Sequence, residues 1–195
     1  MLKTVLCGCL CLGGLQAGEL PAWWQGFPAL AQLESPFVQE SESAVFGKLR
    51  REGVLRLAQG GRLRVEYRQG MLLVADGRSL VQYDPQARTA QRLDLRQAAR
   101  DTPLLNLLLN PKTLAEFYQA RNGDAGSVVL EPRKPGLPRV TLGGKGRFLN
   151  HLQWTDATGA KQILELSAPH LPAAPFAKAV FTFQAPAGTR WLDGR

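Results

Sequence analysis

Histidine, cysteine and serine are the residues of this sequence that could do chemistry, and none of them has the spacing that such chemistry requires. Neither of the two histidines, His151 and His170, belongs to a cluster of His, Cys, Asp or Glu at metal-ligand spacing. Ser35, Ser79 and Ser127 lack the G-x-S-x-G turn, or any comparable setting, that activates a serine nucleophile. We therefore expect no enzymatic activity, no metal and no cofactor.

The glycine-rich stretch "GGKGR" (143–147) could suggest a phosphate-binding loop. Such a loop precedes a helix, because the amino-terminal N–H groups of that helix bind the phosphate. Here the stretch joins two strand-like segments and opens no helix. It is expected to be a hairpin turn.

The first 17 residues have the composition of a secretory signal peptide. Lys3 precedes an uncharged run from Thr4 to Ala17, which is too short to cross a bilayer but suits the apolar part of such a signal. Cleavage after Ala17 would leave 18–195 as one domain without cysteine, large enough to be stabilised by burial alone. The alternatives are an uncleaved anchor and lipidation at Cys9, because "LCGC" is similar to a lipobox.

The charge balance favours anionic partners. The whole chain has a net charge of +8, and removal of the signal peptide takes away one lysine and no acid, which leaves +7. Nucleic acid is not expected, because the domain is expected to be exported and its arginines follow strands instead of a helix with stacking aromatics. The arginines of 50–68 are either a solvated sheet face or a docking surface for an acidic partner or anionic headgroups.

The elements that must position any site are mostly antiparallel strands. Residues 21–35 have an apolar stripe at helical spacing, which predicts a short amino-terminal helix. Beyond it the period becomes two residues, as in "RLRVEYR" (62–68), where Leu63, Val65 and Tyr67 alternate with charged residues. Roughly eleven or twelve such strands are expected, in segments 36–43, 47–59, 62–68, 71–77, 78–85, 87–94, 117–123, 127–134, 138–144, 147–156, 160–168 and 178–186.

One helical segment is more apolar than an exposed helix requires. "DTPLLNLLLN" (101–110) places five leucines in six consecutive positions. Asp101 or Thr102 can cap it, and Pro103 suits the first helical position. This segment is either a permanent part of the core or a lid over a bound molecule.

The expected fold is mainly β with an α cover. A single antiparallel sheet of this length must curl, and its apolar face must be covered. We expect a curved antiparallel sheet, an incomplete (half) β-barrel of roughly eleven strands, lidded by two or three helices. Whether its apolar interior is filled or hollow does not follow from alternation.

Four segments together resemble the periplasmic outer-membrane lipoprotein carrier family, LolA. "SPFVQE" (35–40) is similar to the first strand of that family, and "LLVADGRSLVQYDP" (72–85) to its central hairpin. "DTPLLNLLLN" is similar to its "TP…LL" helix, and "KAVFTFQAPAGTRWLD" (178–193) to its closing segment. The resemblance spans nearly the whole chain after the signal peptide.

The resemblance implies a half-barrel whose hydrophobic cavity holds lipoprotein acyl chains. The expected lining residues are Leu55, Leu57, Leu63, Val65, Tyr67, Leu73, Trp154 and Phe181, and the expected lid leucines are Leu104, Leu105, Leu107 and Leu108. Such carriers act in the periplasm without using a nucleotide. The implied partners are therefore lipoproteins, the inner-membrane ABC exporter that supplies them and a LolB-like outer-membrane receptor, with the carrier as a monomer.

The sequence departs from the family pattern where members typically carry the Arg-Pro that holds the lid closed. Gln59 and Gly60 occupy that position, and Arg62 lies three positions beyond the family's arginine. Gln59 and Arg62 are the candidates for holding the lid. The hairpin aromatics are also reduced, because Val81 and Gln82 replace the usual Trp and Phe.

Two other functions share the same fold. A LolB-like lipidated receptor would follow if Cys9 carries lipid. A carrier of another lipid, or a regulatory domain that binds a protein partner around a filled interior, is the other alternative.

Overall fold

Twelve strands form one sheet in the part of the chain that the structure describes. The computed structural model describes residues 19–27, 30–101, 103–109 and 111–192, so the predicted signal peptide and Cys9 lie outside the described residues. In chain order the strands are β1 (Gln32–Ser43), β2 (Gly47–Ala58), β3 (Arg62–Tyr67), β4 (Leu72–Asp76), β5 (Ser79–Asp84), β6 (Thr89–Asp94), β7 (Tyr118–Asn122), β8 (Val128–Pro132), β9 (Val140–Lys145), β10 (Phe148–Thr155), β11 (Lys161–Leu166) and β12 (Arg190–Leu192).

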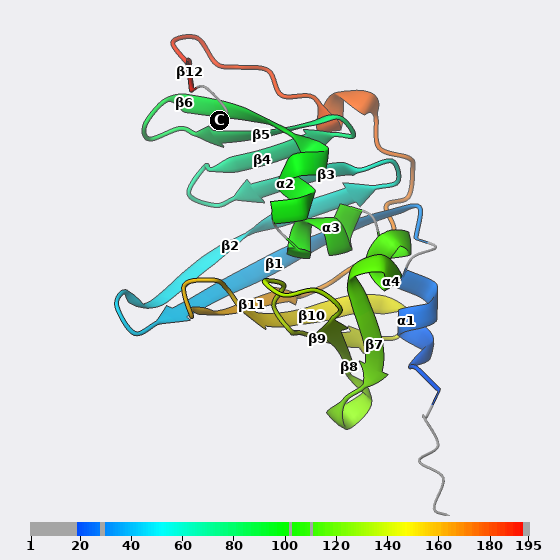
Figure 1. The fold of residues 1–195 in the computed structure, drawn as a ribbon. Coiled ribbons are helices and arrows are strands. Elements are labelled where there is room, and N and C mark those ends of the chain that lie inside the picture. The colour runs from blue at the N-terminus through cyan, green and yellow to red at the C-terminus, as the bar shows by residue number, and fades with distance from the viewer. Residues whose placement is uncertain (1–18, 28–29, 102, 110, 193–195) are drawn as a thin grey trace, which may run out of the picture.

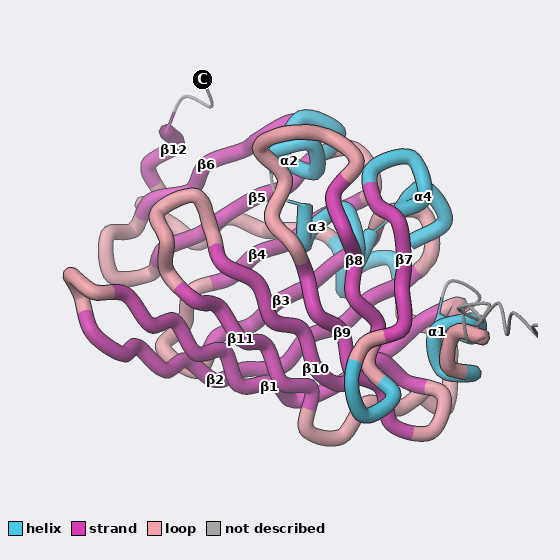
Figure 2. The backbone as a smooth tube through the Cα atoms, turned by 60° about the horizontal axis from the view of Figure 1, so that its bottom comes forward, coloured by secondary structure: helices cyan, strands magenta, loops and turns pink. Residues whose placement is uncertain are grey.

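The helices are short. The α-helices are α1 (Ala22–Gly26), α2 (Leu95–Asp101), α3 (Pro103–Leu109) and α4 (Leu114–Phe117), and the 3-10 helices are η2 (Pro111–Thr113), η3 (Asp124–Gly126) and η4 (Lys178–Phe181). Figure 1 shows α2 and α3 in front of the sheet and α1 beside its other half. Figure 2, turned by 60°, shows the strands curving around these helices.

The sheet is open and almost entirely antiparallel. Its strand order is β12-β6-β5-β4-β3-β2-β1-β11-β10-β9-β8-β7, so β1 lies between two antiparallel halves. Strand β1 pairs with β2 on one side and with β11 on the other, where Phe37 lies opposite Leu166. Only β12 is parallel to its neighbour, β6, among the described strands. The expectation of a curved, open antiparallel sheet covered by helices is confirmed.

The period-two pattern determines which side chains meet inside the curve. On adjacent strands Leu55 lies opposite Val65, and Val65 lies opposite Leu73, so one row of apolar side chains crosses β2, β3 and β4. Intervening arginines and glutamates occupy the outer face, because successive side chains of a strand point to opposite faces. The inner row is the floor on which the helices pack.

The amino-terminal helix is much shorter than the sequence predicts. Only α1 is α-helical in the described part of the predicted range 21–35, and residues 32–35 already belong to β1. Leu33, Ser35 and Phe37 are buried at alternating positions of that strand. The apolar stripe at helical spacing was therefore misleading, since it combined the end of a helix with the start of a strand.

One further expectation was wrong, and one helix was missed. The segment 178–186 is not a strand: it contains η4, and the last strand is β12, farther along the chain. A helix at 95–101 was not expected, although Asp94 supplies its signal. The Asp94 Oδ1 atom accepts a hydrogen bond from the Gln97 backbone N–H at 2.9 Å, which is the geometry of a helix cap.

Candidate functional site

An apolar cavity lies between the concave face of the sheet and α3. Its volume is about 140 Å³. Six of the eight predicted lining residues border it, together with two leucines of α3 and three residues that the prediction omitted. The full lining is Phe37, Gln39, Leu55, Leu63, Val65, Tyr67, Leu73, Leu105, Leu108, Trp154 and Leu164.

Tyr67 and Gln39 at this cavity are neutral and hydrogen-bonded to each other. The Tyr67 hydroxyl donates a hydrogen bond to Gln39 Oε1 at 2.9 Å, and the Tyr67 ring contacts Phe37 edge-to-face with centroids 5.3 Å apart. Burial raises the pKa of Tyr67, against a smaller lowering effect of the nearby Arg51 charge. Tyr67 therefore stays protonated at neutral pH, and the cavity wall suits an apolar ligand.

A second, larger pocket lies on the other side of Leu108. It has a volume of about 380 Å³ and lies between the segment 30–33, the end of β2 and the segments 108–109 and 111–113. Leu108 lines both pockets, so its side chain is part of the wall that separates them. Leu57, which was predicted to line the main cavity, lines this second pocket instead.

The predicted lid leucines take different roles. Leu105 and Leu108 face the cavity, whereas Leu107 is buried in the core. Leu109, which was not predicted, is also buried and lines the second pocket. The side chain of Leu104 lies outside the described residues.

Phe181 does not line the cavity, because it lies on the opposite face of the sheet. The Arg62 guanidinium lies over the Phe181 ring, 5.5 Å from its centroid, and Arg64 Nη1 donates to the Val180 carbonyl oxygen at 3.2 Å. Both arginines alternate with the inward-facing Leu63 and Val65, so they belong to the outer face. The predicted position of Phe181 was wrong because its segment crosses the outside of the sheet.

Among the described residues, no hydrogen bond joins either candidate for holding the lid, Gln59 or Arg62, to α3. Arg62 Nε donates to the Gln59 carbonyl oxygen at 2.9 Å, and its guanidinium packs on Phe181. The Gln59 backbone N–H donates to the Ala31 carbonyl oxygen at 2.9 Å, while its side chain is exposed beside the second pocket. In this state Arg62 is attached to the outer face and Gln59 to the segment before β1.

Most arginines of 50–68 are paired with acids on the sheet surface. Arg56 bridges Glu66 at 2.6 Å and Glu34 at 3.2 Å, and Arg64 also pairs with Glu66 at 2.7 Å. Burial alone would raise the pKa of Glu66, but its hydrogen bonds with Arg64 and Arg56 outweigh that effect and lower it. This network spans β1, β2 and β3 and leaves little unpaired charge there.

Three residues that line the cavity were not predicted to do so, although the sequence pattern indicates their position. Phe37 and Gln39 lie at alternating positions of β1 and line the cavity. Both lie in the expected strand 36–43, whose period of two predicts their shared face, but that strand was not assigned to the cavity lining. Leu164 alternates in the same way in β11.

The described residues contain no group of three or more His, Cys, Asp or Glu side chains placed to hold a metal ion. Within the same described ranges, none of the helices has both the length and the apolar character needed to cross a membrane. The hairpin expected at 143–147 joins β9 to β10, as predicted.

A curved open sheet with an apolar cavity beneath a leucine-rich helix defines a class of binding proteins with a helical cover. Comparison with protein families gives a match to "Outer membrane lipoprotein carrier protein LolA" over residues 29–184. The chain therefore belongs to the LolA family, as the sequence resemblance predicted. A search of curated proteins gave no match.

Solved structures with the same fold have low sequence identity to this chain. An uncharacterized conserved protein from Thermus thermophilus has a TM-score of 0.55 at 10% identity, covering 88% of this chain and 97% of that one. A putative outer membrane lipoprotein-sorting protein domain from Vibrio parahaemolyticus has a TM-score of 0.51 at 11% identity, with 80% and 92% covered. A LolA superfamily protein from Nitrosomonas europaea has a TM-score of 0.50 at 11% identity, with 85% and 99% covered. At these identities the likeness concerns the fold.

Proposed function

We propose that this chain is a periplasmic carrier that binds the acyl chains of lipoproteins beneath α3. In this proposal it receives lipoproteins from an inner-membrane ABC exporter and delivers them to an outer-membrane receptor. It acts as a monomer by binding and not by catalysis. Membership of the LolA family supports the proposal.

The observation that carries the proposal is the position of Leu105 and Leu108 over a small cavity. An engineered cavity of about 150 Å³ accommodates a benzene molecule, so the 140 Å³ found here has room for a ligand of about six carbons. A lipoprotein acyl chain of roughly sixteen carbons needs more room. Displacement of Leu108 would join this cavity to the second pocket, and the combined space falls within the roughly 300–1,000 Å³ typical of ligand sites.

The energetics require a cover that competes with the ligand. Burial of one CH₂ group contributes about 0.8 kcal/mol, so a chain of sixteen carbons could gain on the order of 12 kcal/mol. A carrier that gained this in full for several chains would not release them. When the leucines of α3 pack on the sheet in the empty state, displacing them subtracts from the gain of binding and keeps release possible.

Native mass spectrometry of the protein isolated from its own periplasm tests the proposal. Co-purified diacyl or triacyl species would support it and would identify the cargo class. An empty protein that also fails to accept lipoprotein from membrane vesicles would contradict it. Hydrogen exchange provides a second test, because protection of 103–109 should decrease when acyl chains are bound.

A further inference from the structure

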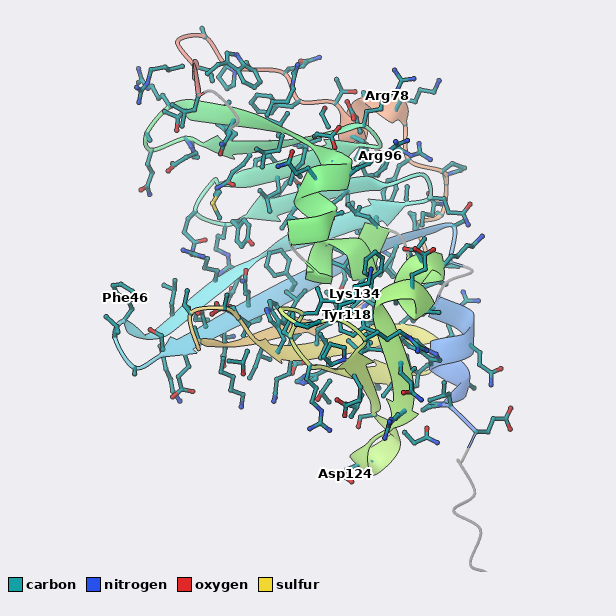
Figure 3. The ribbon with its side chains drawn as sticks, in the orientation of Figure 1. Phe46, Arg78, Arg96, Tyr118, Asp124 and Lys134 are labelled. Atoms are coloured by element: carbon teal, nitrogen blue, oxygen red, sulfur yellow. The ribbon has the colours of Figure 1, made fainter. Side chains whose placement is uncertain are left out.

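The tip of the β1–β2 hairpin exposes two adjacent large apolar side chains. Val45 is 81% exposed and Phe46 is 88% exposed, the highest values among the large hydrophobic residues that the structure describes. Figure 3 shows Phe46 at the far end of this hairpin, pointing away from the body of the molecule. Single exposed apolar residues are ordinary on protein surfaces, but an adjacent pair at a projecting tip is an unfavourable arrangement unless something covers it.

The turn holds these side chains in a defined position. Ser43 pairs with Gly47 across the hairpin, and the Ser43 Oγ atom accepts a hydrogen bond from the Phe46 backbone N–H at 2.9 Å. Gly47 has a φ of +67°, the left-handed conformation that closes a three-residue hairpin loop. The tip is therefore an ordered turn that displays Val45 and Phe46.

The hairpin extends along β1 and β2 beyond the residues that line the cavity. Gln39 lines the cavity and lies opposite Arg51, and the Ser43–Gly47 pair lies four residues farther along β1. At about 3.3 Å per residue the tip projects about 13 Å past Gln39. Leu49, opposite Ser41, lies on the same concave face between the cavity and the tip and is also exposed.

The charges beside the tip are balanced. Arg50 pairs with Glu40 at 2.7 Å and with Glu52 at 3.4 Å, and Lys48 pairs with Glu42 at 3.7 Å. With Arg51 included, Glu40, Glu42 and Glu52 equal Lys48, Arg50 and Arg51 in number, so the hairpin has no excess of either sign with which to select a charged peptide. A stable protein partner needs about 800 Å² of surface on each side, which two side chains on a narrow projection do not supply. A lipid bilayer has no such requirement, because it can take up a narrow apolar wedge at the boundary between headgroups and acyl chains.

We propose that Val45 and Phe46 insert into the surface of a lipid bilayer and that the hairpin thereby holds the concave face beside the cavity close to the membrane. This inference rests on the proposed carrier function and adds the surface through which cargo enters or leaves. An acyl chain exchanged with the exporter or the receptor at the membrane surface would pass along the concave face beside Leu49 to reach the cavity. The balanced charges of the hairpin make the attachment mainly apolar and only weakly dependent on salt.

Vesicle flotation tests this inference with the whole protein. The vesicles contain phosphatidylethanolamine and phosphatidylglycerol at a ratio of about three to one, and the tip variant is Val45→Ser with Phe46→Ser. Leu171→Ser is the matched control, because Leu171 is a 39% exposed apolar residue outside this hairpin. We expect the tip variant to partition at least about tenfold less than wild type, the control to stay within about twofold, and about 0.5 M NaCl to weaken wild-type binding less than about threefold.

Three results would overturn the inference: no vesicle binding by wild type, equal losses in the tip and control variants, or complete release of wild type by the same salt. If wild type bound no vesicles, a protein partner would be the remaining occupant of the tip. Binding of a fluorescent fatty acid in the absence of vesicles distinguishes this failure from failure of the carrier function. The tip variant should bind that probe as wild type does, since neither substituted residue lines the cavity, whereas a wild-type protein that binds no probe would contradict the carrier function itself.

Discussion

Leu108 is the side chain whose removal should most clearly separate binding from stability. It lines both the 140 Å³ cavity and the 380 Å³ pocket, so Leu108→Ala removes part of the wall between them. The substitution also removes apolar contacts that keep α3 packed on the sheet. Both effects should favour the ligand: the first gives it space, and the second weakens the closed state that competes with it.

The expected magnitudes follow from the three carbon atoms that the substitution removes. A ligand chain that fills the vacated space buries about three more CH₂ groups at about 0.8 kcal/mol each, which predicts a gain of about 2.4 kcal/mol, or about sixtyfold in Kd. A fully buried Leu→Ala substitution costs roughly 2.7–5 kcal/mol of stability. Leu108 is only partly buried, so we expect the free energy of unfolding to fall by about 1.5–2.5 kcal/mol.

Titration with a fluorescent fatty acid measures the affinity, and urea denaturation measures the stability. Leu149→Ala is the matched control, because Leu149 is fully buried in the same core but lines neither pocket. The control should lose more stability than Leu108→Ala, about 3–4 kcal/mol, with no gain in affinity. If Leu108→Ala bound the probe no more tightly than wild type, or if Leu149→Ala gained as much affinity, the assignment of Leu108 as a displaceable wall would be refuted.

Three further predictions concern stability. Tyr118→Phe should raise the free energy of unfolding by about 1 kcal/mol, because the Tyr118 hydroxyl is buried without a partner among the described residues and burial raises its pKa to about 12; thermal denaturation that showed a loss would contradict this. Because folding lowers the pKa of Glu66, its ionised carboxylate contributes to the free energy of unfolding above its unfolded pKa, near 4.5, and this contribution is lost as pH falls through the folded pKa. Glu66→Gln should therefore reduce the loss of stability measured below about pH 5, by no more than about 1 kcal/mol. Gly144→Ala should cost about 1–3 kcal/mol in urea denaturation, because its new Cβ would overlap the Trp23 ring, whereas the Cβ of Gly143→Ala would lie 3.1 Å from the His151 Cβ and should cost less.

The sheet and most of the cavity floor were predictable because they depend on local periodicity. Alternation in β2 and β3 placed Leu55, Leu63 and Val65 on one face, and the cavity includes all three. Leu57 shares that face but lines the second pocket, because position along a strand and not its period decides which pocket a residue borders. The sequence pattern specifies the face and leaves the position to tertiary packing.

The failures concern segments whose partners are distant in sequence. "KAVFTF" alternates like a strand, yet Phe181 packs on Phe176 and Arg62 across the outer face of β3. That position depends on the whole segment after β11 crossing the outside of the sheet, which no local pattern encodes. Arg62 was assigned to the lid by its distance from a family motif, but the alternation of β3 turns it outward.

The position of β1 between the two halves of the sheet has a consequence for how the chain folds. Strands β1 to β6 each follow their hydrogen-bonding neighbour in sequence, and so do β7 to β11, so each half can form from successive hairpins with short loops. Joining the halves requires β1 to meet β11, with most of the chain between them, and this late step carries a large loop-closure cost. Helices α2, α3 and α4 lie in the connection between the halves. The leucine-rich helix α3 therefore reaches its final packing only when β1 and β11 pair. Residues that stabilise the β1–β11 pairing should govern the folding rate more than residues within either half.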